Sequence, residues 1–81
     1  KQNPTPIIQT IWSNIPHSHK EKEETEKSIS LTIYPQDFLT ECNHILTTLK
    51  KSHTLLDEFM IDITAQKLII RFKKPPHHVS L

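Results

Sequence analysis

Glycine is absent from all 81 residues of the sequence. Loops that cradle nucleotide phosphates usually need glycine, because only a backbone without a Cβ can approach the phosphate closely. Phosphate-binding loops and dinucleotide-binding turns are therefore not expected in this chain.

Cysteine, net charge and long apolar runs are also scarce. The single cysteine, Cys42, excludes an internal disulfide. Ten basic and nine acidic residues give a net charge of +1, so no overall attraction to nucleic acid or to an acidic membrane is expected. No apolar run approaches the roughly 18 residues of a membrane span, so any membrane contact would need an anchor outside these residues. Hydrophobic residues make up only 35%, which suggests either a partly solvated chain or a core completed by a partner.

The first 16 residues form an apolar arm that is interrupted by prolines. Four large apolar side chains recur at spacings of three and four, which places them on one face of a short helix. Pro6 suits the first turn of such a helix. The alternative is an extended peptide that docks elsewhere. In both cases these four side chains are either core residues or the candidate partner-binding residues: Ile8, Ile11, Trp12 and Ile15.

Residues 17–27 are almost entirely polar and are interpreted as a charged, flexible linker. Residues 28–75 form the predicted core, and residues 76–81 a frayed tail. Alternating apolar residues predict a strand over 28–34. Apolar residues at helical spacing, from Phe38 to Leu49, predict a helix over 36–52.

The stretch from Phe59 to Phe72 predicts a hairpin. With Ala65 and Gln66 at its tip, Ile63 would face Leu68, Ile61 would face Ile70, and Phe59 would face Phe72. A four-residue loop over 64–67 would keep the same faces. The fold class is thus α+β, with a strand-helix-strand-strand core that is ferredoxin-like or a truncated version of it. One helix would cover a three-stranded sheet, whose free edge invites dimerisation.

No catalytic residue, metal site or cofactor is predicted, and the chain is not interpreted as an enzyme. Its histidines, including the pairs His17/His19 and His77/His78, show no four-ligand spacing for zinc. Cys42 lies on the apolar helix stripe and is expected to be a small buried side chain. Asp37 and Glu41 are expected to stabilise the helix N-terminus.

Basic residues gather near the C-terminus and support an alternative function. They would form one face of the last strand and its continuation, and an open sheet with a basic face can bind RNA or DNA. The residues concerned are Lys67, Arg71, Lys73 and Lys74. Few exposed aromatic residues are expected beside them for base stacking, so a protein partner or a homodimer is the preferred interpretation.

Four stretches in the core carry a resemblance to a known family. They are Ser28-Ile29-Ser30-Leu31-Thr32-Ile33, Asp37-Phe38-Leu39, Leu55-Leu56-Asp57-Glu58-Phe59-Met60-Ile61-Asp62-Ile63 and Leu68-Ile69-Ile70-Arg71-Phe72. With them, the stretch from Ser28 to Pro75 resembles the periplasmic domains of inner-membrane assembly proteins, of the PilO type in type IV pili and the GspM type in type II secretion. The resemblance implies a ferredoxin-like, dimer-forming scaffold subunit without catalysis, on the periplasmic face of an inner membrane. It also implies that the apolar arm supplies the first half-repeat of the family fold, although the arm shows no strand pair.

Overall fold

A computed structural model describes residues 3–51 and 56–75 and shows two helices and one four-stranded sheet. In chain order the elements are α1 (Thr5–Asn14), β1 (His19–Glu24), β2 (Ser28–Tyr34), α2 (Phe38–Lys50), β3 (Leu56–Asp62) and β4 (Lys67–Lys73). The predicted tail over 76–81 and the predicted end of the second helix at residue 52 lie outside the described residues.

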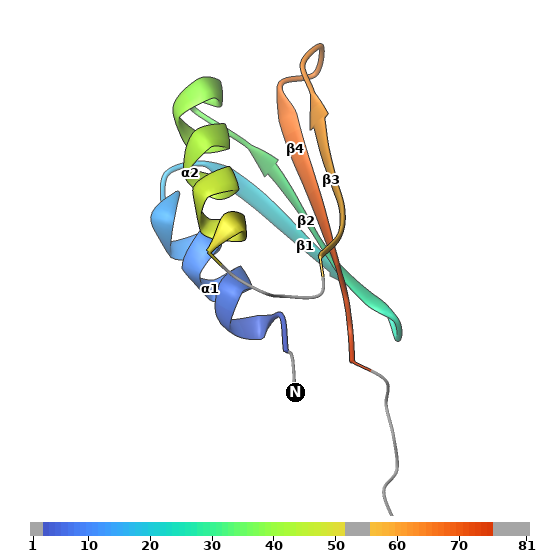
Figure 1. Cartoon of the computed structure of the whole chain (residues 1–81). Helices are drawn as coiled ribbons and strands as arrows, with labels where there is room; N and C mark the ends of the chain where they lie inside the picture. The colour runs from blue at the N-terminus through green and yellow to red at the C-terminus, as the bar shows by residue number, and fades with distance from the viewer. Residues whose placement is uncertain (1–2, 52–55, 76–81) are drawn as a thin grey trace, which may run out of the picture.

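The sheet has the strand order β1-β2-β4-β3, and each pair of neighbours is antiparallel. Both helices lie on the same side of it (Figure 1). The chain therefore consists of two successive α-β-β units, joined along the central pair β2–β4. The same sheet order arises when the first strand of a β-α-β-β-α-β chain is moved to its end. The predicted α+β class is confirmed, and the arrangement is compatible with a ferredoxin-like fold.

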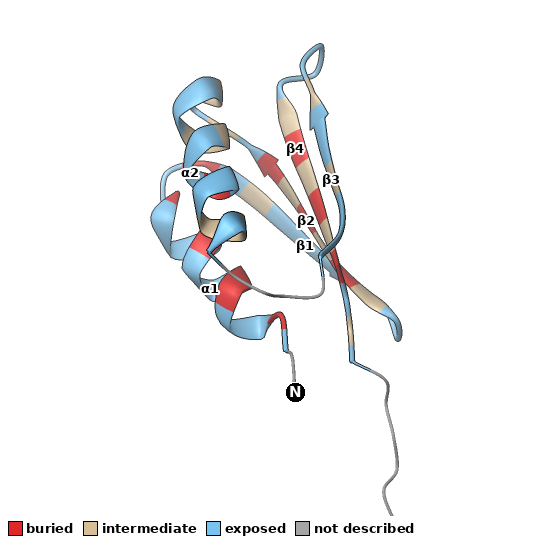
Figure 2. Cartoon of the chain, in the orientation of Figure 1, coloured by how far each residue is buried: buried red, intermediate tan, exposed pale blue. Residues whose placement is uncertain are grey.

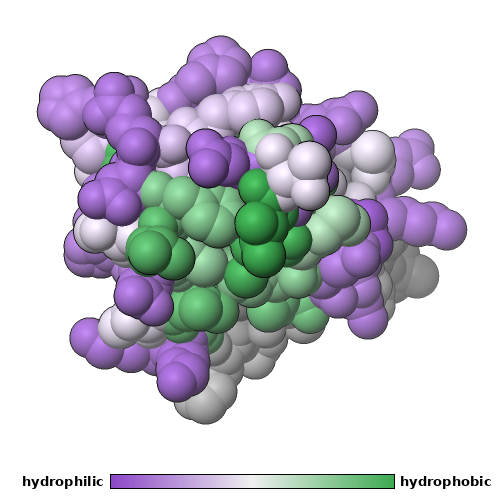
Figure 3. All heavy atoms as spheres, turned by 90° about the horizontal axis from the view of Figure 1, so that it is seen from above, coloured by the Kyte–Doolittle hydropathy of each residue, from purple (hydrophilic) through white to green (hydrophobic). Residues whose placement is uncertain are grey.

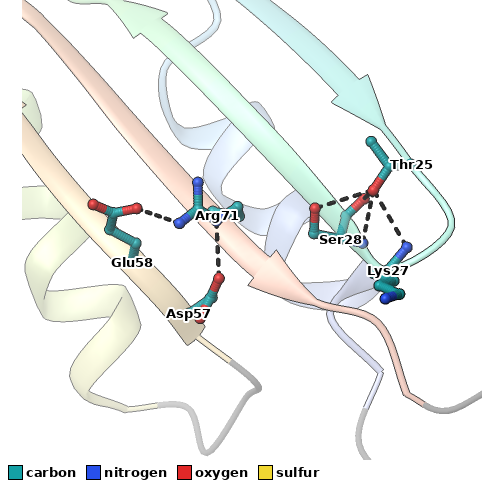
Figure 4. A network of polar contacts seen from close by, with 6 residues as sticks. All are labelled: Thr25, Lys27, Ser28, Asp57, Glu58 and Arg71. Atoms are coloured by element: carbon teal, nitrogen blue, oxygen red, sulfur yellow. Dashed lines mark hydrogen bonds and ion pairs between the residues drawn. The ribbon is translucent and has the colours of Figure 1, made fainter.

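The charged segment 17–27 is not a linker, and this prediction was wrong. Its residues 19–24 form β1, which pairs with β2 along its full length. A tight turn joins the two strands: the Thr25 hydroxyl oxygen accepts the backbone N–H groups of Lys27 (3.3 Å) and Ser28 (3.1 Å) (Figure 4). Composition alone predicts disorder here, but backbone pairing with an apolar strand does not require apolar side chains in the partner. The sheet consequently has four strands and not three.

The apolar arm is the helix α1, with Pro6 in its first turn. The side chains of Ile7, Ile8 and Ile11 are buried, as is Ile15 just beyond the helix. The described part of the arm, residues 3–16, therefore belongs to the core of the same domain and is not a separate unit.

The core lies between the helices and the inner face of the two central strands (Figure 2). Every second residue of β2 and β4 is buried, as the alternating pattern predicts. The eleven buried apolar side chains are Ile7, Ile8, Ile11, Ile15, Ile29, Leu31, Ile33, Ile45, Leu68, Ile70 and Phe72.

The β3–β4 hairpin is present, but its register is two residues away from the predicted one. Phe59 faces Ile70 and Ile61 faces Leu68, so the faces are right and the partners are wrong. The turn occupies residues 63–66, where Asp62 Oδ1 accepts the backbone N–H of Ala65 (3.0 Å) and Gln66 has a φ of 54°. Ile63 thereby lies in the turn, where it is 74% exposed.

Candidate protein-binding edge

Three of the four predicted partner-binding residues cannot contact a partner in this structure. Ile8, Ile11 and Ile15 are at most 4% exposed, and they hold α1 on the sheet. Trp12 is the exception, with 38% of its surface exposed. The periodicity found the correct helical face, but it could not show that this face meets the chain's own sheet.

Trp12 is held in place by Lys20 at the start of β1. The Lys20 ammonium donates to the carbonyl oxygens of Ile15 (2.6 Å) and Ser18 (3.0 Å) and lies 5.3 Å from the centre of a Trp12 ring. This cation–π contact and the bonds to the chain beyond α1 join the helix to the first strand. Trp12 therefore has a structural role, whether or not a partner also touches it.

The predicted basic face on β4 is present but lies beside acidic residues. Arg71 Nε donates to Asp57 Oδ2 (2.8 Å), and another guanidinium nitrogen bonds to Glu58 (Figure 4). The hydrogen bond to Asp57 and the charge of Glu58 raise the pKa of Arg71.

Two of the other members of the basic set, Lys67 and Lys74, have acidic neighbours as well. Lys67 stands opposite Asp62 in the hairpin, and Lys74 Nζ lies 2.6 Å from Glu24 Oε2. The hydrogen bond from Lys74, together with its charge, lowers the pKa of Glu24. Lys73 stands opposite Ser28 and is exposed, so it is the one member of the set without an acidic neighbour among the described residues. Non-specific nucleic-acid affinity depends on several positive charges that are free to neutralise phosphates. This weakens the nucleic-acid alternative.

Asp37 and Glu41 stabilise the start of α2, as predicted. Asp37 caps the helix by accepting the backbone N–H of Thr40 (3.2 Å). Glu41 accepts the hydroxyl of buried Ser18 (2.6 Å), and Ser18 in turn accepts the backbone N–H of Gln36 (3.0 Å). Glu41 and Ser18 thus join the start of β1 to α2, while Asp37 caps α2 itself; no described histidine is bonded to this group.

The histidines and the cysteine form no recognisable reactive group. His19 is exposed and lies 3.1 Å from Glu21, while His77 and His78 fall outside the described residues. Cys42 is half-buried and packs against the core, rather than being fully buried as predicted. Across residues 3–51 and 56–75, no group of three or more His, Cys, Asp or Glu side chains is placed to hold a metal ion.

A depression of about 450 Å³ lies between α1 and α2. Thr10, Asn14, Thr48 and Lys51 line it, together with Pro6 and Ile7. Specific small-molecule sites combine an apolar lining with a few converging polar groups, often ones with a perturbed pKa. Four of the six residues that line this depression are polar, so it lacks the apolar lining of such a site.

After α1, the basic face and the depression, the remaining candidate for a binding surface is the outer edge of the sheet at β3. The sequence pattern assigned the apolar residues of this strand to the core. No side chain of β3 is fully buried. Ile61 is 40% exposed and Phe59 is half-buried, although both point to the helix side of the sheet. Met60 and Leu56 are exposed as well. The alternating pattern predicted correctly which face of β3 these side chains lie on. It could not show how much of that face the helices cover.

Helix α2 exposes two leucines next to this edge. Phe38 and Ile45 face the core, and each following residue is rotated by about 100° around the helix. Thr48 and Lys51 of α2 line the depression against α1, and the same rotation places Leu39 and Leu46 on the opposite side of α2, away from α1. We call the four side chains on the helix side, Leu39, Leu46, Phe59 and Ile61, the open margin. Apolar atoms gather in one continuous area when the molecule is seen from above (Figure 3).

The opposite edge of the sheet is different in kind. On its helix side, β1 carries Lys20, Lys22 and Glu24 at the positions that correspond to Ile61, Phe59 and Leu56 in β3. Charged side chains on an edge strand discourage pairing with another chain, whereas an apolar edge strand invites it. Charged side chains therefore border the core at β1, whereas at β3 apolar side chains at its border are partly exposed to solvent.

Neither described helix is long and apolar enough to cross a membrane. No protein-family model, no curated protein and no solved structure matches the chain significantly. Its function has to be argued from these surfaces.

Proposed function

We propose that this chain is a non-enzymatic protein-interaction domain that acts as a scaffold, and that the β3 edge with the open margin is its binding surface. The observation that carries the proposal is the incomplete cover of the core on that side. α1 buries three side chains within its length, whereas α2 buries only Ile45. A partner on the β3 side would remove from water the apolar surface that this chain leaves exposed.

The two α-β-β units support a more specific version of the proposal. The resemblance to PilO-type and GspM-type domains implies a fold made of two half-repeats. The chain supplies a helix and a strand pair in each half, with β1 and β2 in the first. On this basis we propose a scaffold subunit of a pilus or secretion assembly machine, located at the periplasmic face of an inner membrane.

Site-specific photo-crosslinking in cells that make the protein would test the binding surface. A photoreactive amino acid at position 61, on the β3 edge, is expected to give an adduct that protease removes and nuclease does not. The matched control carries the same group at Glu26, an exposed residue in the β1–β2 turn at the other side of the molecule. A protein adduct that is equally strong at both positions, or at neither, would contradict the proposal. A nuclease-sensitive adduct would favour the nucleic-acid alternative.

A further inference from the structure

We infer that the β3 edge binds an extended strand of another protein in which apolar residues alternate with Lys or Arg. This inference rests on the proposed function and specifies the partner. It is argued from the free edge of the sheet, from the two faces of β3 and from the charges on one of them.

The backbone of β3 is available for strand addition. Within the residues that the structure describes, β3 is the last strand of the sheet order and pairs with β4 on one side only. Every second residue of an edge strand directs its N–H and C=O away from the sheet. An added strand would satisfy these groups, and its side chains would then alternate between the two faces of the sheet.

The helix-side face of β3 selects apolar residues. Every second residue of an added strand would lie beside Phe59 and Ile61, on the side of the sheet that carries α2. Burying these side chains removes apolar surface from water, which favours the complex. A polar residue at these positions would lose its water without gaining a partner.

The other face of β3 selects positive charge. Asp57, Glu58 and Asp62 lie there, and β3 contains neither Lys nor Arg. On the β4 side, Asp57 and Glu58 both bond to Arg71, and Asp62 stands opposite Lys67. A carboxylate has about four acceptor positions, so each can also accept a donor from the opposite side. Lys or Arg on the added strand would stand directly across from these groups, where opposite charges are favourable.

A second copy of this chain fits the edge poorly. Antiparallel pairing of β3 with itself about Met60 would set Glu58 of one copy opposite Asp62 of the other. Any such pairing brings the three carboxylates of each strand, Asp57, Glu58 and Asp62, to one face of two neighbouring strands. Like charges directly opposite each other are destabilising. The open margins of two copies could pack against each other, but their acidic faces would repel. The edge is therefore better suited to a strand of a different protein.

The test uses the full 81-residue chain and a fluorescein-labelled peptide of ten residues in which Lys or Arg alternates with Ile or Phe. Its twin carries Glu in place of every Lys and Arg. Fluorescence anisotropy at physiological salt is expected to show at least tenfold tighter binding of the basic peptide. Methylating the backbone nitrogens that face β3 is expected to abolish binding, while methylating the alternate set leaves it intact.

Three variants locate the site. Ile61→Lys is expected to lower the affinity of the chain for the basic peptide at least fivefold. Ile63→Lys, in the neighbouring turn, is expected to leave that affinity unchanged. The variant E58Q/D62N is expected to reduce the preference for the basic peptide over the acidic one. Circular dichroism verifies that each variant is folded.

Equal affinity for the two peptides, or full affinity in Ile61→Lys, would overturn the inference. So would sedimentation showing a dimer of the chain that Ile61→Lys converts to monomer, since the occupant would then be a second copy. If crosslinking at position 61 yields a protein but the basic peptide does not bind, the inference is wrong while the proposed function stands. If position 61 yields no protein adduct either, both are wrong.

Discussion

Ser18 is the one polar side chain counted among the buried residues of the described chain, and it joins two elements. Its hydroxyl donates to Glu41 of α2 and accepts the backbone N–H of Gln36. A buried donor or acceptor without a partner costs about 1–3 kcal/mol. The contact therefore fixes where β1 begins relative to α2, although β1 itself has few apolar side chains to hold it.

Replacing Ser18 with alanine is expected to lower the free energy of unfolding by about 1–3 kcal/mol, because the Gln36 N–H and one Glu41 oxygen lose their partner. Urea unfolding followed by circular dichroism measures this. Ser13→Ala, at an exposed position of α1, is the matched control and should stay within about 0.5 kcal/mol of the parent. Equal stabilities for the two variants would show that the Ser18 contacts do not stabilise the fold.

Glu24 and Lys74 form an ion pair that can be followed by its titration. The hydrogen bond and the charge of Lys74 lower the pKa of Glu24. Because the folded-state pKa lies below the unfolded-state value, the pair stabilises the fold above the unfolded-state pKa. That contribution is lost as the pH falls through the lowered folded-state pKa.

An NMR titration of the Glu24 carboxyl is expected to give a pKa below that of an unstructured glutamate, and Lys74→Gln should raise it towards that value. Lys27→Gln serves as the control, since it removes the same charge from the adjacent turn without removing the bond to Glu24. A Glu24 pKa that shifts equally in both variants would indicate general charge and not the specific pair.

At the scale of elements, the β3–β4 turn carries the clearest local strain. Gln66 adopts a φ of 54°, in the left-handed region that costs a residue with a Cβ roughly 1–2 kcal/mol. Asp62 compensates in part by accepting the Ala65 N–H. The absence of glycine from the sequence forces another residue into this position.

Gln66→Gly is expected to stabilise the chain by up to about 1 kcal/mol, because glycine adopts this backbone conformation without a steric penalty. Thermal unfolding measures the change. The control is Ala65→Gly at the preceding residue, where φ is not positive and glycine only adds entropy to the unfolded chain. A lower melting temperature for Gln66→Gly than for the parent would contradict the turn geometry.

The same elements show how far the sequence could predict the fold. The alternation in β2 and β4 and the helical spacing of α2 were sufficient, because side-chain burial governs those elements directly. The strand β1 was missed because its pairing depends on backbone bonds to β2 and leaves no apolar periodicity to detect. The hairpin register was displaced by two residues because Asp62 and Gln66 set the turn, and a shift of two preserves every face. The binding edge was missed for a related reason: periodicity assigns Phe59 and Ile61 to a face but cannot show that α2 stops short of covering them.

For the whole molecule, α1 decides whether the rest of the chain can fold. It and the residue that follows supply four of the eleven buried apolar side chains, Ile7, Ile8, Ile11 and Ile15. Burying each is worth about 1.5–3 kcal/mol, and the total stability of a small domain is about 5–15 kcal/mol.

A chain lacking residues 1–16 is therefore expected to lose cooperative unfolding and most backbone amide protection. Heat-induced unfolding and hydrogen exchange would detect both changes. Gln9→Ala, at an exposed position of α1, should unfold like the parent. A cooperative transition in the shortened chain would restore the interpretation of the first 16 residues as a separate arm.

The two edges of the sheet should also differ in how they resist aggregation. β1 exposes charge on both of its faces, whereas β3 exposes Met60 and Ile61. An edge strand without a Lys gatekeeper is the preferred point of non-specific strand pairing at high concentration.

Ile61→Lys is therefore expected to raise the concentration at which light scattering detects aggregates, and Lys22→Ile on β1 is expected to lower it. Both residues are exposed on edge strands, so each change is expected to alter stability little. If Lys22→Ile changes solubility and Ile61→Lys does not, the uncovered side of this molecule is β1, and the β3 edge is not the surface that meets other chains.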